Sequence, residues 1–224
     1  MLTLAIDTST SAITAAVADG AQVLSTASVL DPRGHTEQLA PTIAAALDRA
    51  VVGVGQLDRI AVGVGPGPFT GLRVGLVTAV TMGYALGIAV HGVCSLDALA
   101  RQAAESIGGE FVVATDARRK EVYWATYRAS EAGAERSGEV AVARPADLPE
   151  RVQGLPVVGR GAVLYPEILG ALALDRDQHP MLDVDAAWVA RLADEFVAAG
   201  RTTPVEPMYL RRPDALTTAE RAAP

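Results

Sequence analysis

Residues 63–75 read Gly-Val-Gly-Pro-Gly-Pro-Phe-Thr-Gly-Leu-Arg-Val-Gly, and this stretch decides the fold that we expect. The apolar run at 60–64 leads into it and predicts a short buried strand. Proline fixes φ and glycine relaxes it, so residues 65–68 predict a tight, defined turn. Thr70 is a favoured helix N-cap, and a helix is expected from Gly71 to Leu86.

The expected helix carries an unusual stripe of small residues. They recur every four residues and are Gly71, Gly75, Ala79, Gly83 and Gly87. A glycine inside a helix costs roughly 0.5–1 kcal/mol relative to alanine, so the stripe indicates that another backbone must come close. No charged residue occurs from Val74 to Val90, and a helix that is apolar nearly all round is buried on more than one side. We predict a core or interface helix and not a membrane span, because the segment is at the short limit for a span.

Composition limits the class of protein. The 224 residues suffice for one large domain or two small lobes. Nineteen Lys and Arg against 26 Asp and Glu leave a net charge of −7, which disfavours a stand-alone nucleic-acid binder. Cys94 is the only cysteine, and the N-terminus lacks the pattern of a signal peptide. We therefore expect a soluble cytoplasmic protein with no membrane partner.

The order of apolar runs and turns predicts an α/β fold of two lobes. In the first lobe, residues 1–93, we expect strands at 2–7, 12–18, 22–28, 60–64 and 88–92 and helices at 36–51 and 71–86. In the second lobe, residues 94–212, we expect strands at 111–116, 121–127, 140–143 and 155–158 and helices at 96–105, 162–169 and 186–199. Residues 213–224 are expected to form a disordered tail.

Asp7, Thr8 and Ser9 follow the first strand, and Asp116 ends a strand of the second lobe. A carboxylate at a strand end beside hydroxyl groups can hold hydrated Mg²⁺ and face a nucleotide phosphate. Two carboxylates that cap turns are the simpler interpretation, which spacing alone favours. These four residues are the candidate vestigial nucleotide or anion site. The Gly-Pro turn adds no phosphate loop, because it lacks a lysine and its prolines remove donors.

Two further features have ordinary explanations beside functional ones. His35 precedes a helix, but a histidine pair for a metal would need a second histidine where Leu39 stands, so no metal site is predicted. The run at 118–120, Arg-Arg-Lys, could touch phosphate or RNA, and a solvated hairpin tip is the simpler interpretation.

Several motifs, taken in order, resemble the bacterial TsaB (YeaZ) family. They span residues 5–10, 34–41, 63–75 and 116–123. A weaker match covers residues 204–211, which end in Met-Tyr-Leu-Arg. The run Gly-Pro-Gly-x-Phe-Thr-Gly-x-Arg-x-Gly is highly specific. Pro68 departs from it, because the family usually has serine there, and should stiffen the turn.

This resemblance implies an actin/hexokinase/Hsp70-like (ASKHA) fold, with a mixed sheet flanked by helices in each lobe. It implies a non-catalytic subunit in the synthesis of N6-threonylcarbamoyladenosine at position 37 of tRNA. Such a subunit scaffolds and activates the catalytic subunit TsaD together with the ATPase TsaE, and forms a homodimer when alone. It lacks the metal-binding histidine pair of TsaD, as this chain does at Leu39. Contact with tRNA is then expected only through the complex.

In that family the first two long helices form the subunit interface. The helices expected at 36–51 and 71–86 carry too little charge for the surface of a monomer, in agreement with that implication. The residues predicted to contact a partner are Leu39, Ile43, Leu47, Gly71, Val74, Gly75, Thr78 and Met82.

The alternative is an ATPase or phosphotransferase that acts on its own through Asp7 and Asp116. Fold alone does not decide between the two functions. No intrinsic cofactor is expected, but ATP or ADP could sit at a subunit boundary of the complex.

Overall fold

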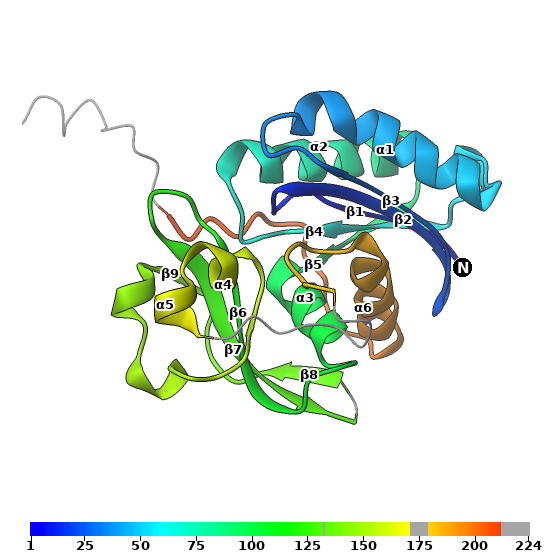
Figure 1. Cartoon of the computed structure of the whole chain (residues 1–224). Coiled ribbons are helices and arrows are strands. Elements are labelled where there is room, and N and C mark those ends of the chain that lie inside the picture. Colours follow the sequence, from blue (N-terminus) through cyan, green and yellow to red (C-terminus); the bar gives the residue numbers. More distant parts are fainter. Residues whose placement is uncertain (132, 171–178, 212–224) are drawn as a thin grey trace, which may run out of the picture.

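The computed structural model describes residues 1–131, 133–170 and 179–211 of the chain (Figure 1). The first sheet has the strand order β3-β2-β1-β4-β5. Its strands are β1 (Leu2–Asp7), β2 (Ala12–Asp19), β3 (Gln22–Leu30), β4 (Arg59–Gly63) and β5 (Ala89–Val93). β1 to β3 form the expected antiparallel meander, and β4 and β5 add in parallel beside β1.

The second sheet has the order β10-β6-β7-β8, with β9 paired to β7. Its strands are β6 (Gly109–Asp116), β7 (Val122–Ser130), β8 (Gly133–Arg136), β9 (Ala141–Ala143) and β10 (Val157–Val158). β10 runs parallel to β6 and the other pairings are antiparallel, so both sheets are mixed. This architecture confirms the predicted α/β class, with a mixed sheet in each lobe.

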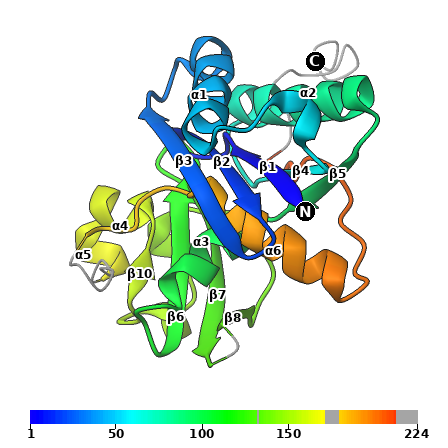
Figure 2. The same cartoon turned by 90° about the vertical axis from the view of Figure 1, so that its right-hand side faces the viewer.

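The helices form layers on the sheets. α1 (His35–Ala50) and α2 (Phe69–Leu86) lie side by side on the outer face of the first sheet, as both views show (Figures 1 and 2). α3 (Ser95–Ala103) and α6 (Ala186–Ala198) lie on its other side, in the middle of the molecule. The short helices are α4 (Arg160–Leu164), α5 (Pro166–Leu169), η1 (Val54–Gln56), η2 (Pro145–Asp147) and η3 (Glu150–Val152).

One continuous core joins the two lobes. It contains Ala5 and Ala16 of the first sheet, Leu99 of α3, and Phe111 and Tyr127 of the second sheet, all nearly or fully buried. Small side chains on β1 and β2 let α6 pack closely, so a helix from the second half covers the first sheet. The residue boundary predicted between 93 and 94 stays a prediction. The predicted disordered tail at 213–224 lies outside the described residues.

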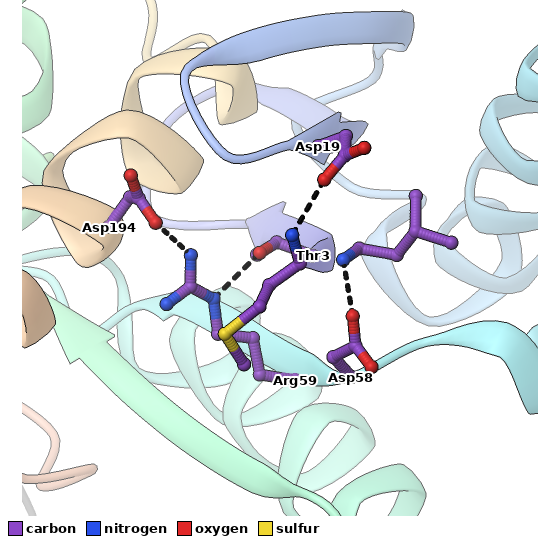
Figure 3. A network of polar contacts seen from close by, with 7 residues as sticks. Thr3, Asp19, Asp58, Arg59 and Asp194 are labelled. Carbon is purple, nitrogen blue, oxygen red and sulfur yellow. Dashed lines mark hydrogen bonds and ion pairs between the residues drawn. The ribbon is translucent and has the colours of Figure 1, made fainter.

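A polar network fastens α6 to the first sheet (Figure 3). The Arg59 side chain is 3% exposed, its Nε donates to Thr3 Oγ1 at 2.8 Å, and its Nη2 donates to Asp194 of α6. Nearby, the terminal ammonium of Met1 bonds Asp19 at 2.6 Å. A buried guanidinium needs such partners, because an unpaired buried charge is strongly destabilising.

The end of the described chain forms a strap, Thr203–Arg211, that crosses both lobes. Gly92 N donates to Thr203 O at 3.0 Å, and Met208 N donates to Val64 O at 2.8 Å. Arg211 then forms an ion pair with Glu121 of the second lobe. The strap therefore links the edge strand β5 to the β6–β7 hairpin.

The predicted start of α2 differs from the observed one. The helix begins at Phe69, with Pro68 as N-cap and no side-chain cap, whereas Thr70 was the expected cap. The reason is that Leu72 N already donates to Pro68 O at 2.9 Å, so the helical ladder begins two residues earlier. Thr70 is exposed in the first turn.

Candidate functional site

Asp7 ends β1 inside the molecule and is completely buried. Its Oδ1 accepts hydrogen bonds from Ser9 N at 2.8 Å and Ser9 Oγ at 2.7 Å. Its Oδ2 accepts from Ser95 Oγ at 2.6 Å. Burial raises the pKa of Asp7 above its ordinary value of 3.8, although the serine hydrogen bonds oppose the shift. The carboxylate is thus held by its own chain, as a turn-capping group would be.

The elements around Asp7 fit it closely. A side chain at Gly63 would overlap the Asp7 carboxylate and the Ser95 hydroxyl, so β4 requires glycine there. Thr8 Oγ1 donates to Gly71 O at 2.8 Å and ties the turn between β1 and β2, which we call the first turn, to the start of α2. Ser95, the first residue of α3, is a site residue that the sequence analysis missed, because it lies 88 positions from its partner.

A small cavity lies between the lobes, beside Asp116. Its volume is about 10 Å³, and it is lined by Thr10, Ser11, Pro68, Thr115, Asp116, Arg118, Arg160, Leu182 and Asp183. The hydroxyls of Thr10 and Thr115 are buried there without a hydrogen-bond partner. A cavity of this volume holds about one water molecule. As it stands, the cavity is far too small for a nucleotide, since ligand pockets typically measure about 300–1,000 Å³.

Two ion pairs line this cavity. Arg160 Nε and Nη2 bond the two oxygens of Asp183 at 2.8 and 2.6 Å. Asp116 accepts from Arg118 N at 2.7 Å and pairs with the Arg118 guanidinium at 2.9 Å. Arg160 and Asp183 were missed as well, because nothing in the sequence relates them.

Gly159, directly before Arg160, has φ = 101° and packs against the Ala114 carbonyl. Of the four predicted site residues, Asp7, Thr8 and Ser9 share one turn. Asp116 lines the cavity with Thr10 and Ser11 and not with Asp7.

His35 is buried at the start of α1, and its Nε2 donates to Thr10 O at 3.0 Å. Among residues 1–131, 133–170 and 179–211, no three His, Cys, Asp or Glu side chains converge as metal ligands would. The histidine therefore joins α1 to the first turn.

The glycine stripe of α2 faces inward. Gly71 lies against Thr8 O and His35, Gly75 against the Thr8 hydroxyl, and Gly83 against Val90. The backbone that approaches the stripe thus belongs to the same chain. Gly71 and Gly75 are buried in this subunit against Thr8 of the turn between β1 and β2, so they have almost no area to offer a partner, and their role as partner contacts stays a prediction.

The other six residues predicted to contact a partner fall into a buried group and a half-buried group. Leu39 and Ile43 are 2% and 6% exposed and belong to the core beneath α1, so they too have almost no area to offer a partner. Four residues are half-buried and border the outer surface, where their role in an interface stays a prediction: Leu47, Val74, Thr78 and Met82.

The outward side of α2 is apolar and uncovered. Val77 is 63% exposed, Val80 48% and Tyr84 92%, and they recur at helical spacing. Exposed small residues of α1 continue this surface, which we call the helical face: Ala40, Pro41 and Ala44 of α1 with Val77, Val80, Thr81, Tyr84 and Ala85 of α2. Exposed apolar patches of this kind mark interaction sites.

By length and composition, α2 is also long and apolar enough to cross a membrane, with a mean hydropathy of 1.3 over 18 residues. It packs on the first sheet through Leu72, Leu76 and the glycine stripe, and a third of it is buried. A core helix of a water-exposed protein passes the same test, so this feature alone does not indicate a span.

Comparisons with known proteins agree with the TsaB-like motifs of the sequence. A family model described as "TsaD: tRNA N6-adenosine threonylcarbamoyltransferase" matches residues 29–178. The tRNA threonylcarbamoyladenosine biosynthesis protein TsaB of Escherichia coli (strain K12) is 34% identical over 222 residues, which cover 94% of this chain and 95% of that protein. An uncharacterised protein of Mycobacterium leprae is 40% identical over 218 residues. The match covers 96% of this chain but only 56% of that protein.

A solved structure matches the whole fold. YeaZ from Pseudomonas aeruginosa superimposes with a TM-score of 0.78 at 29% identity, covering 93% of this chain and 99% of that one. With a relative above 30% identity along nearly its full length and a family model over most of the sequence, the chain belongs to the TsaB (YeaZ) family.

Proposed function

We propose that this chain is the non-catalytic subunit that scaffolds and activates TsaD, together with the ATPase TsaE, in forming N6-threonylcarbamoyladenosine at position 37 of tRNA. The observation that carries the proposal is the uncovered helical face on a chain of the TsaB family. In this proposal the protein works in the cytoplasm and meets tRNA only within the complex.

The site between the lobes supports a role without catalysis. Asp7 is buried, and both its oxygens accept hydrogen bonds from serines of the same chain. The cavity beside Asp116 measures about 10 Å³, so a nucleotide would have to break the Arg160–Asp183 pair or separate the lobes to enter. A catalytic group needs access to substrate; the full burial of Asp7 and the 16% exposure of the Asp116 side chain, which pairs with Arg118, therefore support the proposal.

The helical face supports the assignment of the partner. Its residues are apolar or small, and Tyr84 stands almost fully exposed at its end. Aromatic side chains of this kind are enriched among the residues that dominate binding energy. The same face serves a homodimer when TsaD is absent, because a twofold interface uses one patch on both subunits.

Reconstitution tests the proposal. TsaD and TsaE from the same organism, with tRNA, ATP, threonine and the other pathway components, are assayed with and without this chain for modified adenosine. We expect modification only when the chain is present. Full activity in its absence would refute the proposal.

The Tyr84→Glu variant is expected to lose both TsaD binding and the stimulation of tRNA modification.

Calorimetry with ATP addresses the alternative function, since saturable binding and turnover by the isolated chain would favour an independent ATPase. Binding of nucleotide only when TsaD is present would instead place it at a subunit boundary.

A further inference from the structure

The turn between β6 and β7 carries the strongest concentration of positive charge along the chain. Residues 118–120, Arg-Arg-Lys, are its longest run of consecutive cations and include its only lysine. All three residues are exposed. Since the chain as a whole has a net charge of −7, this turn is a local exception to an acidic protein.

The backbone holds these cations in an uncommon conformation. Arg118, Arg119 and Lys120 have φ values of 61°, 53° and 63°, a left-handed region that residues other than glycine seldom adopt. The Asp116 carboxylate accepts from Arg118 N and so fixes the turn. Three such residues in succession indicate that the shape of this hairpin tip is maintained against its local preference.

The strap brings aromatic surface next to the turn. Arg211 of the strap pairs with Glu121, the residue that follows the turn. Tyr209, two residues before Arg211, packs on Phe69 with ring centroids 5.2 Å apart. Tyr209 is 43% exposed and Phe69 52%. The Arg73 guanidinium lies 4.4 Å from the centre of the Phe69 ring. Cations and exposed rings therefore form one continuous surface.

We call this the basic turn surface: Phe69, Arg73, Arg118, Lys120 and Tyr209. Within the described residues, neither Arg73 nor Lys120 forms an ion pair, so their charges are not cancelled by a carboxylate. Arg118 keeps its guanidinium 48% exposed although it pairs with Asp116. Phosphate groups complement such cations, and unpaired bases stack on exposed rings.

We propose that the basic turn surface contacts RNA when the protein is assembled with TsaD. Lys120 and Arg118 contact backbone phosphates, and Tyr209 provides a stacking surface for an unpaired base. This inference rests on the proposed function, which supplies RNA as the substrate of the complex. The surface borders the N-terminal end of α2, whereas Tyr84 of the helical face lies near the other end of that helix.

The test measures the affinity of the complex of this chain with TsaD for a fluorescein-labelled, unmodified tRNA transcript by anisotropy, at 50 to 200 mM salt. Each phosphate contact changes affinity about threefold over this range. For Lys120→Gln we expect a salt slope reduced by about 1, with binding about threefold weaker at 200 mM salt and about tenfold weaker at 50 mM. For Tyr209→Leu we expect binding about fivefold weaker or more with an unchanged slope, because stacking is not ionic.

Matched variants separate this effect from loss of charge in general. Arg128 lies on β7 and is also exposed, but it is roughly 20 Å further along the strand from the turn. Arg128→Gln should leave affinity and slope unchanged, and Lys120→Arg should keep wild-type binding.

Three results would overturn the inference. They are an unchanged slope in Lys120→Gln, equal weakening by Arg128→Gln, or loss of TsaD from the complex in Lys120→Gln. If instead the wild-type chain fails to bind TsaD or to support modification, the proposed function itself fails, and the two failures are therefore distinguishable.

Discussion

Val77 offers the sharpest test of the helical face. It lies midway along α2 and is 63% exposed. Complete burial of a valine side chain contributes about 1.5–3 kcal/mol, so covering the exposed part at an interface contributes about 1–2 kcal/mol. Val77→Glu removes this term and places an unpaired carboxylate in the contact, which costs several kcal/mol more. A total above about 3 kcal/mol weakens TsaD binding by more than about 100-fold.

The fold should not respond to the same change. Because Val77 points outward and glutamate has the better helix propensity, the free energy of unfolding should stay within about 0.5 kcal/mol of the wild type. Val163→Glu is the matched control, since Val163 is a valine 54% exposed on helix α4 of the other lobe. Its binding to TsaD should be unchanged.

Isothermal titration calorimetry with TsaD gives the affinity, and urea unfolding gives the stability. Wild-type affinity in Val77→Glu would refute the assignment of the helical face. Equal loss in both variants would do so too, because it would trace the effect to charge and not to position.

Three further predictions concern the interior. Gly75→Ala should lower the free energy of unfolding by about 1–3 kcal/mol, measured by urea denaturation, because the added methyl would overlap the Thr8 hydroxyl. Burial raises the pKa of Asp7 above its ordinary value of 3.8, so above pH 3.8 the folded state keeps a proton that the unfolded state has released. The stability that this group contributes is therefore lost as the pH rises through the folded pKa. Asp7→Asn should remove that fall when unfolding curves of the two proteins are compared between pH 4 and 8. Asp194→Ala should cost about 2 kcal/mol in the same unfolding assay, because it leaves the buried Arg59 guanidinium without its carboxylate.

Matched variants make these outcomes decisive. Gly55→Ala adds a methyl group where no atom lies within 4 Å, so its stability should be close to wild type. Asp194→Asn keeps an acceptor for Arg59 and should lose less than Asp194→Ala. Equal effects of Gly75→Ala and Gly55→Ala would contradict the close approach of α2. A pH dependence shared by wild type and Asp7→Asn would contradict the assigned titration.

Much of the fold followed from local patterns. The meander, the strand-turn-helix at 60–86 and the long helix α1 were predicted from short-range periodicity and turn residues, and the structure confirms them. Asp7 and Asp116 were correctly placed at strand ends, because each follows an apolar run. Ser95, Arg160 and Asp183 could not be found, since tertiary packing alone brings them to the site.

The sequence by itself determined that α2 would be an apolar helix with a small stripe, following a rigid Gly-Pro turn. It did not determine which side of that helix faces the solvent, because a helix apolar nearly all round has no polar face to point outward. Only the tertiary structure decided this. The first turn and β5 lie against Gly71, Gly75 and Gly83, where a larger side chain would not fit. That packing turns Val77, Val80 and Tyr84 outward, so the surface proposed for a partner is the side opposite the glycines.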